Sequence, residues 1–185
     1  MPADPTRGVI ATERDGLGIA RIEPGRGRTA EVAEILRTNF GIAPPNAPRC
    51  VSRGDVTIGG IAPNAWIAVH TSAGNSFAQS LRPLLGDRAA VADQSDAYSI
   101  LRLTGPKVRE TLAKLVPIDV HPRNFQVNDV AQTVCGYMSV TLWRLEDSMR
   151  GEPTFEIWVG RSLAGSLQEV IRHSAAGLGF VRQTP

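Results

Sequence analysis

The stretch FEIWVGRSLAGSLQEVI, residues 155–171, predicts a strand that leads directly into a helix. Its first five residues are mostly large and apolar, and Leu163, Leu167 and Ile171 then recur at helical spacing. A second stretch, AWIAVHTSAGNSFAQSLRPLL, residues 65–85, repeats this hydrophobic pattern. The repetition predicts that the chain contains two similar units.

Each half of the chain reads as strand, helix, loop, two strands, helix and short strand. In the first half, a helix capped by Thr29 and stopped at Gly41 precedes two strands within DVTIGGIAPNAWIAVH, residues 55–70. In the second half, AYSILRL, residues 97–103, and TVCGYMSVTLWRLED, residues 133–147, have the alternation of strands. The pattern predicts an α+β fold made of two β-α-β-β-α-β-like units, with antiparallel sheets and helices packed on them.

The expected boundaries divide the chain into four segments. A polar tail, residues 1–15, precedes the first unit, residues 16–96; the second unit, residues 97–181, precedes a short tail, residues 182–185. We expect the two units to form one compact domain. The opening residues MPADPTRG lack the apolar segment of a secretory signal.

Composition is typical of a soluble globular protein, with 42% hydrophobic and 21% charged residues. The 20 basic residues are balanced by 18 acidic ones, so we expect no nucleic-acid partner. No apolar run approaches the ~20 residues of a membrane helix, so no membrane partner is expected either. Cys50 and Cys135 lie far apart, without the spacing of metal ligands. Two reduced thiols in a cytoplasmic protein are the simplest interpretation.

One motif resembles a dinucleotide-binding turn. GRGRTA, residues 25–30, matches the pattern G-x-G-x-x-[GA]. Such a turn follows a buried parallel strand, and an acidic residue ends a second strand about 20 residues later. Here the preceding strand carries Arg21 at its centre, and Asp55 comes before its strand instead of after it. The motif is therefore interpreted as a turn that enters a helix.

Candidate catalytic groups are scattered. The chain has three widely separated histidines, His70, His121 and His173, and no H-E-x-x-H motif. His121 beside Asp119 has the residue types of an oriented general base, although a loop histidine next to proline is more often structural. Asp93 and Asp96 are expected to bond local backbone N–H groups, with a paired carboxylate site as the alternative. We therefore predict no catalytic, cofactor-binding or metal-binding residue.

The strand hairpin of the second half carries large apolar groups on both faces. Met138, Val140 and Leu142 alternate with a second set that includes Tyr137 and Trp143; on the next strand, Trp158 opposes Phe155, Ile157 and Val159. Helices cover one face, and the other face also needs cover. Either the other half of the chain or another subunit supplies it. The candidate residues of a subunit interface are Tyr137, Trp143 and Trp158.

Three stretches together resemble a known family. They are DQSDAYSILRLTGPKVRETLAKLVPIDVHPRNF (residues 93–125), TVCGYMSVTLWRLED (133–147) and FEIWVGRSLAGSLQEVIRHSAAGLGF (155–180). The chain resembles the gamma subunit of heterotetrameric sarcosine oxidase. The residues that carry the resemblance are Asp96 before a strand, Gly105-Pro106 opening a helix, Asp119 and Phe125, Thr133 beginning a strand, and Arg161-Ser162 opening the last helix.

The resemblance extends to the folate-binding core of the aminomethyltransferase family, which includes the glycine-cleavage T-protein. The resemblance implies that the chain has the fold of this folate-binding core. It also implies a non-catalytic role beside alpha, beta and delta subunits, with most of the contact made to the large alpha subunit. That bacterial enzyme oxidatively demethylates sarcosine to glycine, forming hydrogen peroxide and 5,10-methylenetetrahydrofolate. The resemblance assigns FAD, FMN, NAD and tetrahydrofolate to the other subunits, and no cofactor to this chain.

Departures from the wider family leave two alternatives open. TVCGYMSV shares only a Cys and a Tyr with the Lys-Gly-Cys-Tyr-x-Gly-Gln-Glu signature of relatives that assist iron–sulfur enzymes. No folate or catalytic residue is therefore transferred to this chain. The first alternative is a stand-alone folate-binding module or regulator. The second is the equivalent subunit of a related N-methyl amino acid dehydrogenase.

Overall fold

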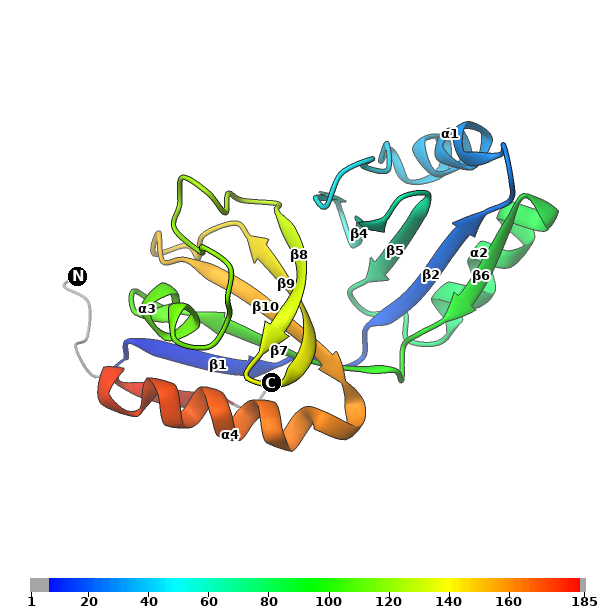
Figure 1. Ribbon diagram of the computed structural model, residues 1–185. Helices are drawn as coiled ribbons and strands as arrows, with labels where there is room; N and C mark the ends of the chain where they lie inside the picture. Colours follow the sequence, from blue (N-terminus) through cyan, green and yellow to red (C-terminus); the bar gives the residue numbers. More distant parts are fainter. Residues whose placement is uncertain (1–6, 184–185) are drawn as a thin grey trace. The chain divides into compact units, whose positions relative to one another are not determined.

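The computed structural model describes residues 7–183 and contains, within them, two sheets and four α-helices (Figure 1). The chain divides into two compact units. The central unit is Gly16–Ala97, and the terminal unit combines the described parts of Met1–Asp15 and Tyr98–Pro185. The predicted α+β class is confirmed, with helices and antiparallel strands in each unit. That the two units make one compact domain stays a prediction.

The central unit is a five-stranded antiparallel sheet with two helices. The strand order is β3-β4-β5-β2-β6. The strands are β2 (Gly18–Pro24), β3 (Cys50–Arg53), β4 (Val56–Ala62), β5 (Ala65–His70) and β6 (Ala89–Asp93); the helices are α1 (Thr29–Phe40) and α2 (Ser76–Leu85). One core cluster joins Val32 and Leu36 of α1, Leu81 of α2 and Trp66 of β5, so both helices pack on the sheet.

Local sequence explains where these helices end. Gly41 adopts the left-handed conformation, with φ 67°, and closes α1 as expected. Pro83 lies in the last turn of α2, which continues to Leu85. The expected side-chain cap of α1 is wrong, because Thr29 is already the first helical residue and its hydroxyl contacts Asn64.

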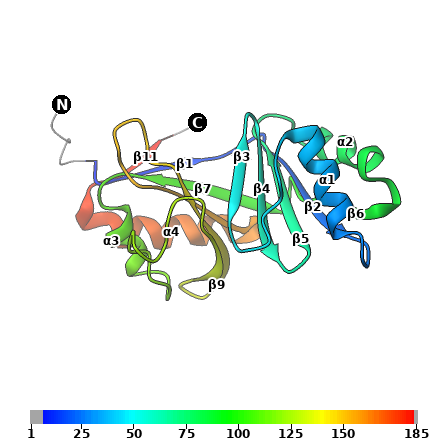
Figure 2. The same ribbon diagram turned by 90° about the horizontal axis from the view of Figure 1, so that it is seen from above.

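The terminal unit is a six-stranded sheet with the order β11-β1-β7-β10-β9-β8 (Figures 1 and 2). Its strands are β1 (Val9–Glu13), β7 (Tyr98–Thr104), β8 (Val130–Cys135), β9 (Met138–Leu145), β10 (Thr154–Gly160) and β11 (Phe180–Gln183). All neighbours are antiparallel except β1 and β11, which are parallel. The helices are α3 (Val108–Ala113) and α4 (Ala164–Ala175).

Two strands lie where the sequence indicated none. Residues 9–13, placed in the polar tail by the sequence, form β1, which pairs with both β7 and β11 and buries Val9 and Ala11. Strand β11, the short last strand that was expected, extends to Gln183 and so past the expected start of the last tail at residue 182. Strand β3 forms in a stretch where the sequence indicated no strand. β1 and β3 are short and contain few large apolar side chains, so their own patterns are weak.

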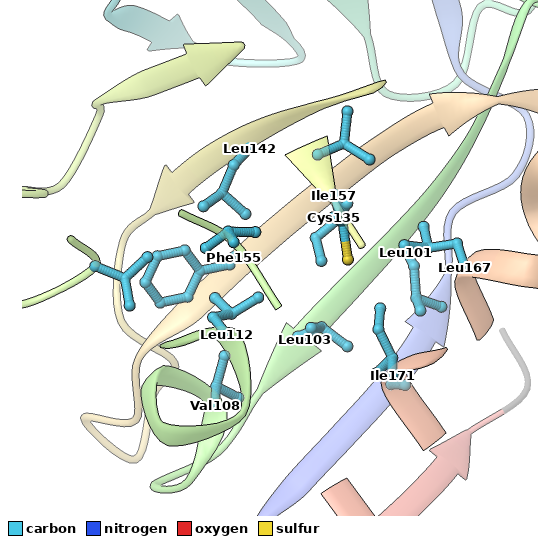
Figure 3. Close-up of a cluster of buried hydrophobic side chains, with 14 of the residues drawn as sticks. Leu101, Leu103, Val108, Leu112, Cys135, Leu142, Phe155, Ile157, Leu167 and Ile171 are labelled. Carbon is cyan, nitrogen blue, oxygen red and sulfur yellow. The ribbon is translucent and has the colours of Figure 1, made fainter. Parts of the chain in front are cut away.

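The core of the terminal unit lies between one face of the sheet and helices α3 and α4. Figure 3 shows this cluster, in which side chains of both helices meet those of the strands; its labelled members include Leu103, Val108, Leu112, Cys135, Leu142, Phe155, Ile157, Leu167 and Ile171. The opposite face of the same sheet carries Trp143 and Trp158, which are not in this cluster. The predicted alternation of the two hairpin strands is therefore confirmed.

The thiol of Cys135 lies in this core and is fully buried. Burial raises the pKa of Cys135 to about 11, from the ordinary value of 9.0. A raised thiol pKa means that folding favours the protonated form. The stability that this contributes is present below about pH 9 and is lost as the pH rises towards about pH 11.

We therefore expect the free energy of unfolding of the wild-type chain to fall more steeply between about pH 9 and about pH 11 than that of Cys135→Ala. Urea denaturation of both proteins across this range measures the difference. Parallel pH profiles would contradict the buried, protonated thiol.

Candidate interaction surface

The loop around His121 is held by local hydrogen bonds. Asp119 accepts the backbone N–H of His121 at 2.8 Å and also the side-chain amide of Asn124. The His121 Nδ1 atom accepts the backbone N–H of Arg123 at 3.3 Å. The bond from Asn124, followed by that from the His121 backbone, lowers the pKa of Asp119. Asp119 therefore orients the loop backbone and not the imidazole, which favours the structural interpretation of His121.

The other polar candidates also make contacts that are separate from one another. His173 is exposed on α4, with its Nδ1 atom 2.9 Å from the carbonyl oxygen of Glu169. Asp93 accepts the backbone N–H and the hydroxyl of Ser95 at 3.0 and 2.7 Å. Asp96 accepts the side-chain amide of Asn75 at 3.4 Å. Among residues 7–183, no group of three or more His, Cys, Asp or Glu side chains is arranged to hold a metal ion.

The glycine-rich turn lacks the strand geometry of a dinucleotide site. Strand β2, which precedes it, is antiparallel to both of its neighbours, β5 and β6. The backbone N–H of Arg28 donates to the Gly25 carbonyl at 2.9 Å, which closes a turn into α1. Glu31 in the first turn of that helix pairs with Arg88. A dinucleotide fold needs a parallel strand here, so the interpretation as a simple turn is supported.

The outer face of the terminal sheet, opposite its helices, carries an aromatic cluster. The rings of Trp143 and Trp158 stack, with centroids 4.9 Å apart and an angle of 15°. Tyr98 tilts against Trp158 at 5.7 Å. Both tryptophans are buried, at 1% and 2% exposure, whereas Tyr137 in the β8–β9 turn is fully exposed. The structure thus brings two of the three candidates together and leaves Tyr137 apart. That they contact another subunit stays a prediction.

A buried carboxylate lies beside the aromatic cluster. Glu156 of β10 accepts two N–H groups of Arg102, at 2.7 and 3.1 Å, and the indole N–H of Trp158 at 3.3 Å. The Nε atom of Arg14 lies 3.3 Å from the same carboxylate. Such partners offset the cost of burying a carboxylate that has 8% side-chain exposure. No sequence motif predicts this group, and its one signal is the lone acidic residue within FEIWV.

An open hollow of about 500 Å³ lies along this outer face beside strand β8. Its lining includes Tyr98, Gln132, Val134, Ser139, Thr141 and Trp158, and no lining side chain is charged. Such a surface offers hydroxyl, amide and apolar groups, and it offers no charge to hold an anion or a metal ion. We call it the outer-face hollow.

No helix in the described part of the chain is long and apolar enough to cross a membrane.

Known proteins match the chain over most of its length. Residues 26–176 match the family described as "Sarcosine oxidase, gamma subunit family". The sarcosine oxidase subunit gamma of Corynebacterium sp. (strain P-1) is 33% identical over 125 residues, which cover 67% of this chain and 60% of that protein. The same subunit of Arthrobacter sp is 32% identical over 84 residues, which cover 45% of this chain and 41% of that protein. These matches span less than two thirds of either relative.

Solved structures share the fold. A chain of the heterotetrameric sarcosine oxidase from Corynebacterium sp. U-96, in complex with pyrrole 2-carboxylate, superposes with a TM-score of 0.80 and 21% identity, covering 96% of this chain and 88% of that one. The glycine cleavage system aminomethyltransferase T from Bartonella henselae superposes with a TM-score of 0.67 and 15% identity. The match covers 96% of this chain and 48% of that one. The fold predicted from the resemblance is confirmed. With the family match over residues 26–176, the chain belongs to the sarcosine oxidase gamma subunit family.

Proposed function

We propose that this chain is the non-catalytic gamma subunit of a heterotetrameric sarcosine oxidase in the cytoplasm. Its role is to support assembly with alpha, beta and delta subunits, mainly through contact with the large alpha subunit. The observation that carries the proposal is the family match over residues 26–176. The local hydrogen bonds that occupy Asp119 and Asp93 favour a structural role for these groups over a catalytic one.

The proposed complex oxidatively demethylates sarcosine to glycine and forms hydrogen peroxide and 5,10-methylenetetrahydrofolate. In this proposal FAD, FMN, NAD and tetrahydrofolate are bound by the other subunits. This chain contributes surfaces for contact with the other subunits. Its outer face is uncharged around the hollow, and Tyr137 and Met149, which lie in two hairpin turns, are fully exposed.

Omission of the chain tests its role in assembly. The alpha, beta and delta subunits of the same organism are co-expressed with and without this chain, and the products are compared by size-exclusion chromatography and by sarcosine-dependent peroxide formation. We expect the complete complex and its activity only when the chain is present. Equal assembly and activity without it would contradict the proposal.

Substitution of the two exposed histidines tests the non-catalytic assignment. We expect His121→Ala and His173→Ala to leave the rate of peroxide formation by the assembled complex within about twofold, because loss of a general acid or base lowers rates by about 100-fold or more. His173, whose ring contacts Glu169 and Arg172 of its own helix, is the internal control for His121. A 100-fold loss confined to His121→Ala, in a complex that assembles normally, would assign it a catalytic role.

The stand-alone folate-binding alternative draws on the likeness in fold to an aminomethyltransferase. Tryptophan fluorescence separates it from the subunit proposal, because Trp143 and Trp158 report on the outer face of the terminal sheet. Saturable quenching of the isolated chain by tetrahydrofolate would favour the alternative. The second alternative, a subunit acting with another N-methyl amino acid dehydrogenase, differs in the substrate that the co-purified complex oxidises.

A further inference from the structure

We infer that strand β8 is a docking edge, to which an extended, uncharged segment of another subunit adds as a further strand. The inference rests on the proposed function and names the surface through which assembly takes place. It is carried by three properties of the edge: free backbone groups, missing protection and an adjoining hollow.

The outer side of β8 is unused in the described chain. β8 is the last strand of its sheet, and its six residues pair in regular register with β9, from Val130↔Trp143 to Cys135↔Met138. Among residues 7–183, residues 130–135 make no backbone hydrogen bond outside this pairing. A strand with one unpaired side presents a row of N–H and C=O groups that another strand can bind.

The edge also lacks the features that normally prevent such pairing. Edge strands are protected by charged side chains, prolines or bulges. Residues 130–143, which form β8 and most of β9, contain no charged residue and no proline. The other terminal strands are different: β11 carries Arg182, β3 carries Arg53 and β6 ends at Asp93. An unprotected edge is expected where a partner covers it.

The outer-face hollow supplies the side-chain half of the site. An added strand beside β8 would place alternate side chains on the outer face, next to Gln132 and Val134. Gln132, Ser139 and Thr141 supply one amide and two hydroxyl groups to this lining, which a partner segment can bind. A charged side chain would find no counter-charge in this lining. The fitting segment is therefore extended, with small or apolar, uncharged side chains.

We assign this segment to a different subunit and not to a second copy of the chain. The proposed assembly consists of four different subunits, so a gamma subunit meets other chains and not itself.

A matched pair of variants tests the docking edge. Val134 on β8 and Val51 on β3 are both valines on terminal strands with 39% exposure. In the complex co-expressed with the alpha, beta and delta subunits, we expect Val134→Lys to weaken binding about 30-fold, because a lysine would be desolvated without a partner, and Val51→Lys to bind like the wild type. Circular dichroism checks that both variants fold. Hydrogen exchange of the wild-type complex adds an independent readout, with slower exchange of the β8 amides on assembly.

Three outcomes would overturn the inference. Equal binding by Val134→Lys and Val51→Lys, with unchanged exchange of the β8 amides, shows that the partner binds elsewhere while the proposed function stands. A wild-type chain that forms dimers, which Val134→Lys converts to monomers, shows that a second copy occupies the edge. A wild-type chain that binds none of the three subunits overturns the proposed function itself, and the assigned partner with it.

Discussion

Replacing Phe155 with alanine is expected to lower the free energy of unfolding by about 4 kcal/mol. The ring is fully buried at the centre of the terminal unit. It stacks on Phe125, with centroids 6.2 Å apart, and the guanidinium carbons of Arg109 and Arg144 each lie 5.1 Å from its centroid. Alanine would leave a cavity and would also remove the aromatic face that both cations contact.

The two cations increase the loss of stability expected when the Phe155 ring is removed. Burial, and then the neighbouring charge of Arg144, lowers the pKa of Arg109. Removal of the ring would leave these like charges without their shared aromatic partner. Urea denaturation followed by circular dichroism measures the loss, and Tyr137→Ala, which truncates a fully exposed aromatic residue of the same unit, is the control. We expect the control to change stability by less than about 0.5 kcal/mol. A loss below about 1 kcal/mol for Phe155→Ala would contradict the packing described.

Gly105→Ala is expected to destabilise the chain by about 3 kcal/mol. Gly105 has φ +140°, a conformation that other residues rarely adopt. A Cβ atom at this position would lie 2.4 Å from the carbonyl oxygen of Gly8. That carbonyl cannot easily move, because it accepts the backbone N–H of Lys107 at 2.9 Å. The substitution would therefore push β1 away from the start of α3.

Gly151→Ala is the matched control for this prediction. Gly151 also has positive φ, at +72°, but nothing lies within 4 Å of the position of its Cβ. The backbone strain alone is expected to cost about 1 kcal/mol. Thermal and urea denaturation of the two variants therefore compare a glycine without neighbours with one at which both a close contact and a φ of +140° oppose a side chain. Equal losses for both would show that β1 does not pack against Gly105.

The sequence predicts those parts of the fold whose signals are local. Strand β5 leads to helix α2, and β10 leads to α4, and both pairs are visible as an apolar run followed by apolar residues at helical spacing. Strand β1 is not visible in this way. Its apolar residues are few, and its place depends on pairing with β11 near the other end of the chain, where Val9 faces Phe180. No local pattern specifies such a distant partner.

In the candidate interaction surface too, local patterns are predictable from the sequence and contacts between distant strands are not. Alternation along β9 and β10 predicts that Trp143 and Trp158 share a face, but it does not predict that their rings stack or how deeply they are buried. The partners of Glu156 come from elsewhere in the chain: Arg102 is on β7 and Arg14 follows β1. Pairings between distant strands decide such contacts, and a single sequence carries little information about them.

The most direct test of the account is purification of the tagged chain from its native cells, followed by an absorbance spectrum of the eluate and an assay for sarcosine-dependent peroxide. We predict that larger subunits co-purify, that the eluate has a flavin spectrum, and that it oxidises sarcosine. A chain that elutes alone, colourless and without this activity, would contradict its assignment as a subunit of sarcosine oxidase.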